Sequence, residues 1–274
     1  MSTERSDQRH HVQSMLMRES LLDKSVLAST ETPVVRMLPD AHVVKVGGRS
    51  MIDPGRVTLY PLVDAIAKAL QKHRLIIGVG GGVRSRHVFS IGIDLGLSTG
   101  VLAQLAMADT NGNAHILGTL LAPHGVVAIP PDMFGHLLPL FVRAVPGVVF
   151  HGDPPYSLWE HPPGIGRVPP HRTDCGCFLV AECFGARSLT LVKDVDGVFD
   201  ADPRERPHAS LIREIGTAEL RRKNLKTLPF ERVMMDLVER ARLVKRFQII
   251  NGKKPELLEA ALNGEHVGTI VHAG

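Results

Sequence analysis

The segment 189–203, "LTLVKDVDGVFDADP", places a lysine and four aspartates at the end of a run of apolar residues. Asp194, Asp196 and Asp202 offer oxygen ligands, and Gly197 permits a sharp turn. Carboxylates and an ammonium group at the end of a strand suit the binding of a cation together with a phosphate. The rival interpretation is an Asx-type acidic turn that faces solvent.

Two glycine-rich turns carry basic residues after other apolar runs. The turns "KVGGRS" and "GVGGGVRSRH" contain Gly47, Gly48, Gly80, Gly81 and Gly82, together with Lys45, Arg84 and Arg86. Glycines at the carboxyl end of a parallel strand let backbone N–H groups approach an anion, and the next helix adds the positive end of its dipole. Turn geometry alone would also require glycine. Two basic turns on one sheet edge favour an anion site.

Strand-like apolar runs alternate with segments of helical periodicity from Ala41 onward. Strands are predicted at 41–48, 74–82, 126–130, 188–195 and 246–252, and helices at 58–73, 83–97, 116–125, 175–186, 217–224, 230–245 and 255–264, with a short helix and a strand within 138–152. This alternation predicts an α/β fold, a three-layer αβα sandwich with a mostly parallel central sheet. The Pro-rich stretch between Gly152 and Asp174 is irregular, and such long stretches inside a compact domain are usually functional.

Composition narrows the class of protein. A net charge of +4 over 274 residues, without a long basic run, gives no indication of nucleic-acid binding. The absence of an apolar run of membrane-spanning length and of a signal-peptide core predicts a soluble cytoplasmic protein. Cys175, Cys177 and Cys183 are interpreted as small buried residues on one helix. Residues 1–40 are predicted to be an arm that contacts a neighbouring subunit, although a disordered tail explains them as easily.

The run 172–212 resembles the nucleotide-binding half of the amino acid kinase superfamily, especially bacterial uridylate kinases. It has a Thr-Asp pair that opens a helix, then a strand, then "VDGVFDADP", and the chain closes on "GEHVGT". The resemblance covers residues 41–272 and implies one domain, with an acceptor half at 41–170 and a nucleotide half at 171–272. It implies ATP and Mg²⁺ at the carboxyl edge of the sheet, with Lys45 on phosphate and Asp174 organising the site. Phe199 and Asp202 would lie against the adenosine.

Three departures separate this chain from ordinary uridylate kinases. Gly112 stands where those enzymes hold the acceptor ribose with an aspartate, and Leu191 stands where they have a lysine. Lys193, two places further on, is the candidate replacement, and we count it with Lys45 and Asp174 as catalytic. The Pro-rich stretch "HGDPPYSLWEHPPGIGRVPPHR" is also foreign to that family. These differences indicate a rebuilt acceptor site.

The segments "RMLPDAHVVKVGGRSMIDPGR", "PPYSLW" and "VPPHRTDCGCFL" resemble the molybdenum storage proteins, closest to their β-type chain. That resemblance implies ATP hydrolysis coupled to loading molybdate or tungstate, as polyoxometalate clusters, into a hexameric cage formed with a related chain or with copies of itself. The other chain type carries a histidine triplet that binds clusters. Ser157, Leu158 and Trp159 stand there in this sequence.

Condensing oxoanions takes up protons, and histidine titrates near neutral pH, so histidines are the candidate ligands for the stored clusters. The candidates are His136, His151, His161, His115 and His171. Each of them could instead be a surface residue or a satisfied core group, and His171 could position the Thr173–Asp174 turn. Two alternatives remain at this point. One is a small-molecule kinase with a nucleotide or carboxylate acceptor, and the other is a nucleotide-sensing subunit without turnover.

Overall fold

The computed structural model describes residues 34–163 and 167–274. Its main sheet has the strand order β3-β4-β2-β1-β5-β9-β10-β8, and only the β9–β10 pair is antiparallel. The strands are β1 (Ala41–Val46), β2 (Arg74–Val79), β3 (Val126–Ala128), β4 (Gly147–Phe150), β5 (Ser188–Lys193), β8 (Glu214–Gly216), β9 (Arg246–Asn251) and β10 (Thr269–His272). A separate two-stranded ribbon pairs β6 (Val198–Phe199) with β7 (Leu211–Ile212).

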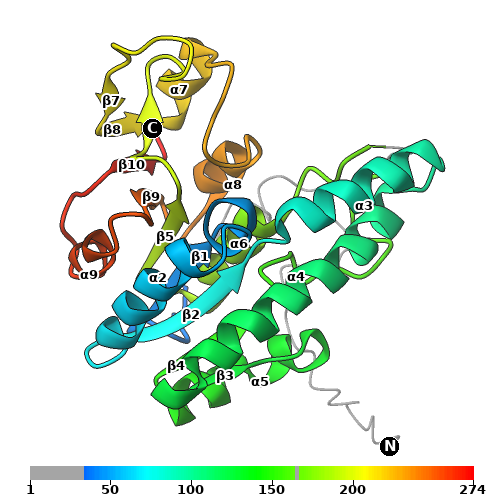
Figure 1. Cartoon of the computed structure of the whole chain (residues 1–274), viewed down its shortest axis with the longest axis vertical. Helices are drawn as coiled ribbons and strands as arrows, with labels where there is room; N and C mark the ends of the chain where they lie inside the picture. The colour runs from blue at the N-terminus through cyan, green and yellow to red at the C-terminus, as the bar shows by residue number, and fades with distance from the viewer. Residues whose placement is uncertain (1–33, 164–166) are drawn as a thin grey trace, which may run out of the picture. The chain divides into compact units, whose positions relative to one another are not determined.

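Helices cover both faces of this sheet (Figure 1), so the predicted three-layer α/β architecture is confirmed. One face packs against α2 (Arg56–Ala69), α4 (Thr99–Leu121) and α9 (Glu256–Leu262), and the other against α5 (Pro131–Ala144), α6 (Thr173–Phe184), α7 (Thr217–Lys223) and α8 (Met234–Arg240). The central strands β1 and β2 are buried along all their residues except Arg74, because both faces of the sheet are covered, and this burial explains their apolar runs. None of the helices within the described ranges is long and apolar enough to cross a membrane.

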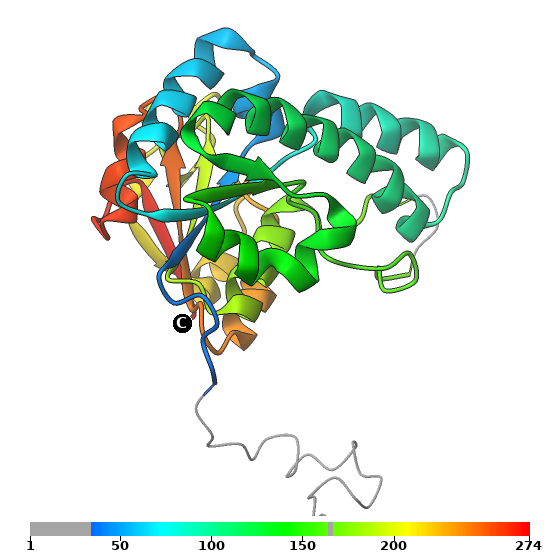
Figure 2. The ribbon, with the colours of Figure 1, turned by 90° about the horizontal axis from the view of Figure 1, so that it is seen from below.

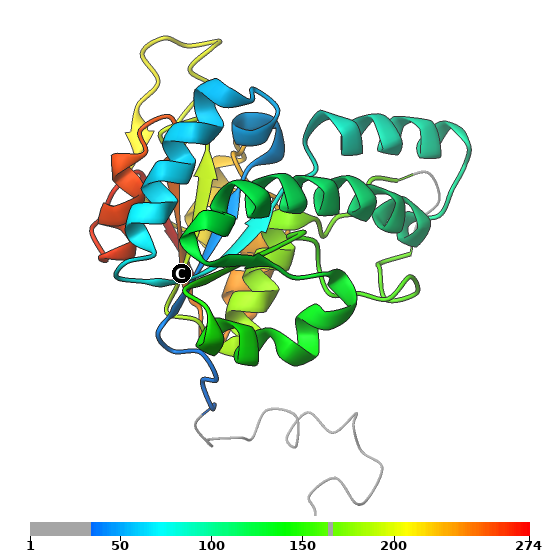
Figure 3. The same ribbon diagram turned by 60° about the horizontal axis from the view of Figure 1, so that its bottom comes forward.

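The helix α3 (Gly82–Asp94) and the first half of α4 run side by side away from the sheet (Figures 2 and 3). The Pro-rich segment lies against α4. The side chain of Gln104 donates to the carbonyl of Tyr156 at 3.4 Å, and the Thr110 hydroxyl donates to the Asp153 carboxylate. At Gly100, an added Cβ would lie 2.1 Å from the carbonyl oxygen of Leu158, so α4 and this segment approach closely.

Three helix predictions were wrong in extent. The short helix expected within 138–152 is α5, which already begins at Pro131. Of the helix predicted at 116–125, residues 116–121 are the end of α4, which already begins at Thr99, and residues 122–124 form a 3-10 turn. The first part of α4 was missed because the buried Thr110 and Asn113 interrupt the apolar pattern. The helix predicted at 230–245 is reduced to the seven residues of α8. After α8 the chain is no longer helical, and the backbone N–H groups of residues 242–244 donate to the carboxylate of Glu182 at 2.7–3.1 Å.

The cysteine prediction was right for two of three residues. Cys175 and Cys177 are buried on α6, whereas Cys183 is exposed on the same helix. The predicted arm at 1–40 lies almost wholly outside the described residues and stays a prediction. The division of the domain at residues 170 and 171 also stays a prediction.

Candidate functional site

A cleft of about 1030 Å³ lies at the carboxyl edge of the sheet, where the turns after β1, β2 and β5 meet. Parallel strands place all their carboxyl ends on one edge, which is where open α/β sheets bind ligands. Most of the residues singled out from the sequence line this cleft, namely Lys45, Gly47, Gly48, Gly80, Gly81, Gly82, Asp174, Lys193, Asp194, Gly197, Phe199 and Asp202.

Strand register brings the two lysines to the same face of the sheet. Lys45 pairs with Leu191 on the neighbouring strand β5, and Lys193 follows two residues later. Because side chains alternate along a strand, a shift of two keeps Lys193 on the α6 face and moves it about 6.6 Å towards the carboxyl edge. A lysine at position 193 instead of 191, the position expected from the uridylate kinase pattern, therefore still directs its ammonium group at α6. Leu191 is part of the hydrophobic core.

Asp174 receives both ammonium groups. Its position in the first turn of α6 places the carboxylate 2.9 Å from Nζ of Lys45, and both its oxygens accept from Nζ of Lys193 at 2.8 Å. The side chains of Lys45 and Asp174 are 6% and 5% exposed, and that of Lys193 is 12% exposed. Two cations sharing one carboxylate leave an excess positive charge at the cleft wall, and such a charge attracts phosphate or another oxoanion.

Burial and charge pairing shift the pKa of each member of this group. Burial opposes ionisation of Asp174, but Lys193 and Lys45 outweigh it and hold the pKa of that carboxyl well below its usual range. Burial also opposes the charge on Lys45, yet Asp174 holds its pKa above the usual value. For Lys193 burial wins over Asp174 and, with repulsion from Lys45, lowers the pKa to about 8.

We expect the affinity for ATP, the ligand that the sequence resemblance implies, to fall as the pH rises through about 8, because Lys193 then loses a charge that would attract phosphate. Stability should change in the opposite sense. The unfolded chain binds this proton more tightly, so the folded state becomes relatively more stable between pH 8 and 10.5. Calorimetric titration of ATP on either side of pH 8 checks the first expectation. The ATP affinity of a Lys193→Arg control should not change over this pH range, because arginine stays charged. A wild-type affinity that does not change with pH would contradict it.

The glycine turns after β1 and β2 pack against each other. A Cβ on Gly48 would lie 2.3 Å from both the carbonyl oxygen of Gly80 and the amide nitrogen of Gly82. Gly82 has φ +73°, and the Asp53 carboxylate accepts the N–H of Val83 at 2.7 Å. The first turn of α3 therefore already holds a carboxylate, so its N-terminus is less open to an external anion than the sequence suggested.

We expect Gly48→Ala to separate the two turns, lowering ATP affinity about tenfold and destabilising the fold by about 1–3 kcal/mol, as overpacking does. Gly112→Ala is the matched control, because an added Cβ there meets nothing within 4 Å. Helix propensity makes that change neutral or stabilising by up to about 1 kcal/mol. Thermal melts and ATP titrations of both variants test this, and equal behaviour of the two would refute the close packing of the turns.

Two of the residues predicted to bind the nucleotide, Arg84 and Asp196, lie outside the cleft lining. The guanidinium of Arg84 donates to Oδ1 of the buried Asn113, whose amide donates to the Gly80 carbonyl at 2.6 Å. Arg84 thus supports the second glycine turn from behind, while Arg86 lines the cleft itself. The Asp196 carboxylate accepts from Asn251 and Lys254 at 3.0 and 2.7 Å, which closes the turn after β5.

Of the histidines singled out as cluster ligands, only His161 and His171 pack against a common ring among the described residues, that of Tyr156. His115 and His136 are exposed on α4 and α5. His151 is buried directly after β4 and accepts the N–H of Asp153 at 3.1 Å. His171 contacts the Tyr156 hydroxyl at 3.0 Å, and His161 is 6% exposed with neither ring nitrogen hydrogen-bonded. Burial lowers the pKa of both His161 and His171, which favours their neutral forms.

The described residues contain no group of three or more His, Cys, Asp or Glu side chains placed to hold a metal ion. The carboxylate of Asp174 is already engaged by two lysines. The described residues therefore offer no built Mg²⁺ site, and a Mg²⁺ ion in this cleft would take most of its ligands from phosphate oxygens and water.

Sequence reasoning missed Glu231. Its carboxylate lines the cleft and accepts the backbone N–H groups of Arg172 and Asp174 at 2.8 and 3.0 Å. Arg49 and Arg172, which also line the cleft, were missed as well. Burial, together with the charges of these two arginines, lowers the pKa of Arg86. Glu231 lies within a predicted helix and 57 residues from its partner, so no local pattern could have revealed the contact.

The sequence profile of the amino acid kinase family matches residues 41–251. The chain belongs to the amino acid kinase family. It is 44% identical to the molybdenum storage protein subunit beta of Azotobacter vinelandii, over 96% of this chain and 97% of that protein. This kinship confirms the resemblance expected from the sequence, down to the β-type chain.

The chain is less similar to the uridylate kinases. The chain is 26% identical to the uridylate kinase of Hyperthermus butylicus, over 84% of this chain and 96% of that protein. Two solved structures share the fold: a uridylate kinase from Archaeoglobus fulgidus, with a TM-score of 0.65 and 22% identity over 84% and 99% of the two chains, and an isopentenyl phosphate kinase, with 0.59 and 19% over 84% and 100%. They support the amino acid kinase fold.

Proposed function

We propose that this chain is a subunit of a molybdenum or tungsten storage assembly, and that it binds and hydrolyses ATP to load molybdate or tungstate as polyoxometalate clusters. The observation that carries the proposal is the 44% identity to a molybdenum storage protein subunit, sustained over 96% of the chain. The cleft geometry supports it, because a buried Lys45–Asp174–Lys193 group with excess positive charge suits phosphate and other tetrahedral oxoanions.

In this proposal the nucleotide lies along the cleft. Its adenosine would contact Phe199 and Asp202, on the side lined by Asp194, Gly197 and residues 227–230, and its phosphates would extend towards Lys45 and Lys193. Phosphoryl transfer depends mainly on positioning and on neutralising charge, so two ammonium groups and the amides of the glycine turns are sufficient machinery. Water attacks the γ-phosphorus, the bond to the bridging oxygen breaks, and ADP and phosphate leave.

The oxoanions would be handled by the acceptor half, residues 41–170. Polycondensation of molybdate takes up protons, and neutral histidines can bind metal atoms through a ring nitrogen. His161 fits such a role best, because both of its ring nitrogens are buried without a hydrogen-bond partner. His136, His151, His115 and His171 remain candidates by position, facing solvent or the Pro-rich segment.

We propose a hexameric cage built with a related chain or with further copies of this one. The relative is named as a beta subunit, which supports a heteromeric assembly. Ser157, Leu158 and Trp159 provide no imidazole where the other chain type is expected to have three, so a partner chain would supply those ligands. Trp159 is 82% exposed, consistent with a surface that a neighbour covers.

Elemental analysis of the purified protein after growth with molybdate or tungstate tests this function. We expect retained Mo or W well above one atom per chain, and slow or no phosphorylation of UMP. Protein without either metal that rapidly phosphorylates UMP would instead support a small-molecule kinase, the class to which the more distant relatives belong by name. Protein that binds ATP without hydrolysing it would support a nucleotide-sensing subunit.

A further inference from the structure

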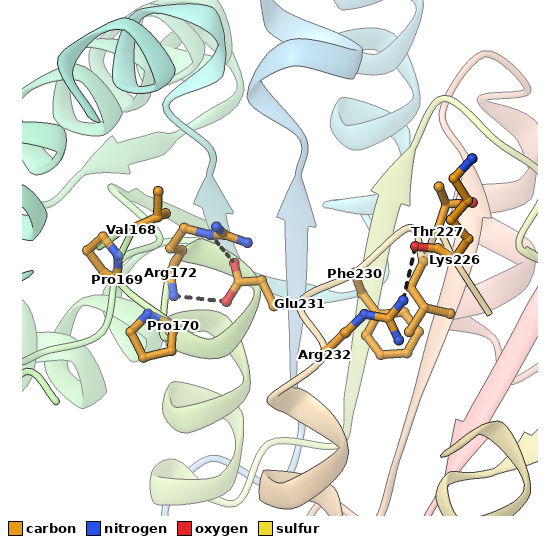
Figure 4. A pocket seen from close by; sticks show the side chains of 10 residues that line it. Val168, Pro169, Pro170, Arg172, Lys226, Thr227, Phe230, Glu231 and Arg232 are labelled. Carbon is orange, nitrogen blue, oxygen red and sulfur yellow. Dashed lines mark hydrogen bonds and ion pairs between the residues drawn. The ribbon is translucent and has the colours of Figure 1, made fainter. Parts of the chain in front are cut away.

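Glu231 holds the start of α6 from outside the helix (Figure 4). Its carboxylate accepts the backbone N–H groups of Arg172 at 2.8 Å, Asp174 at 3.0 Å and Cys175 at 3.4 Å. The guanidinium of Arg172 adds a contact of 3.7 Å to the same carboxylate. Glu231 is 7% exposed, so these bonds form away from most of the solvent.

The first turn of α6 has no other side-chain cap. Arg172 occupies the N-cap position and makes no side-chain capping bond, so three backbone donors depend on the distant carboxylate. An anion at a helix N-terminus also stabilises the helix dipole. Without it, the buried N–H groups would lose their partners and the first turn would loosen.

The same turn carries the carboxylate that joins the two lysines. Asp174 donates its N–H to Glu231, while its side chain accepts from Lys45 and Lys193. A displacement of the turn would therefore move the Asp174 carboxylate relative to both ammonium groups. Misplacing a catalytic group by about 1 Å can reduce turnover about a hundredfold.

Glu231 also ends a segment that faces the nucleotide side of the cleft. Thr227, Leu228 and Phe230 line the cleft and also a second cavity of about 490 Å³ that shares a wall with it. Figure 4 shows Glu231 directed towards the start of α6, with Phe230 on the opposite side of the chain. One short segment thus contacts the space for the nucleotide and the helix that carries Asp174.

We propose that Glu231 is a positioning residue that couples nucleotide contact with residues 227–230 to the placement of Asp174 between Lys45 and Lys193. This inference rests on the proposed hydrolysis of ATP. Glu231 would then act through the backbone N–H groups that it binds at the start of α6.

The experiment compares Glu231→Gln and Glu231→Ala with Glu182→Gln in the full chain. Glu182 is a matched control, because its carboxylate also accepts three backbone N–H groups, those of residues 242–244, and it is absent from the cleft lining. The readouts are the Tm, the kcat and KM for ATP, and the pH dependence of ATP binding by calorimetry.

We expect kcat to fall about tenfold in Glu231→Gln and about a hundredfold in Glu231→Ala, with KM changing less than about threefold. Glu182→Gln should lower the Tm but leave kcat unchanged. Burial lowers the pKa of Lys193, while the charges of Asp174 and Glu231 oppose this lowering and Lys45 adds to it. Glu231→Gln should therefore move the loss of ATP affinity to lower pH, an electrostatic effect that is not expected of Glu182→Gln because Glu182 is not among the groups that shift the pKa of Lys193.

A Glu231→Gln variant with the kcat and the pH profile of the wild-type protein would overturn this inference and leave the proposed function standing. Equal losses of kcat in Glu182→Gln and Glu231→Gln would do the same, because they would indicate general destabilisation. Wild-type protein that neither binds nor hydrolyses ATP would overturn the proposed function, and this inference with it. Should Glu231→Ala fail to fold, the glutamine variant and its pH profile decide the question.

Discussion

Replacing Asp174 with asparagine is expected to reduce ATP hydrolysis about 10²–10³-fold, the range found when one preorganised electrostatic group is removed. Asp174 is the shared counter-charge of Lys45 and Lys193, both buried in the cleft wall. Without it, the two ammonium groups repel each other and one of them loses its proton. Removing one partner of a buried ion pair costs about 3–5 kcal/mol, so the Tm should fall as well.

Steady-state turnover and thermal melts of Asp174→Asn measure both effects. Asp64→Asn, a change at an exposed position on α2, serves as the control and should leave turnover and Tm unchanged. A folded Asp174→Asn protein with wild-type turnover would contradict the assignment of the lysine–aspartate–lysine group as the centre of the chemistry.

The second large effect is expected for Lys193→Ala, which should lower turnover about a hundredfold with little loss of stability. Burial lowers the pKa of Lys193 to about 8, so the folded state carries an unfavourable cost for this charge that alanine removes. Lys45 remains to pair with Asp174. A catalytic loss without a matching loss of Tm would separate function from folding at this position.

Lys254→Ala is the matched control for that measurement. Lys254 also lies near the carboxyl edge and donates to Asp196 at 2.7 Å, yet it is absent from the cleft lining. Its removal should change turnover less than about twofold, the small effect typical of an exposed ion pair. Full turnover in Lys193→Ala would show that the shift of the lysine from position 191 to 193 has no catalytic purpose.

The sequence was most informative where local pattern and sheet geometry act together. The alternation of strands and helices predicted the layers, and the carboxyl ends of β1, β2 and β5 had to meet at one edge. That geometry alone brings Lys45 and Lys193 within reach of one helix. The residues gathered there were therefore predictable, although their chemical roles remain proposals.

The remaining features depend on contacts between distant parts of the chain. Glu231 and Glu182 each bind backbone N–H groups about sixty residues away. These contacts lie at the two ends of the predicted 230–245 helix, where the chain is not helical. Asp53 fills the first turn of α3 in a similar manner. Helical periodicity does not register such carboxylates, so a propensity-based assignment extends the helix through them.

Loading of molybdate by the purified oligomer, with and without ATP, tests the central claim most directly. The protein is first stripped of metal, incubated with molybdate, separated from free oxoanion and analysed for Mo. We predict that ATP raises the retained Mo several-fold over the ATP-free sample, and that Asp174→Asn and Lys193→Ala abolish this gain. Equal retention with and without ATP, or an undiminished gain in the variants, would contradict ATP-driven storage at this cleft.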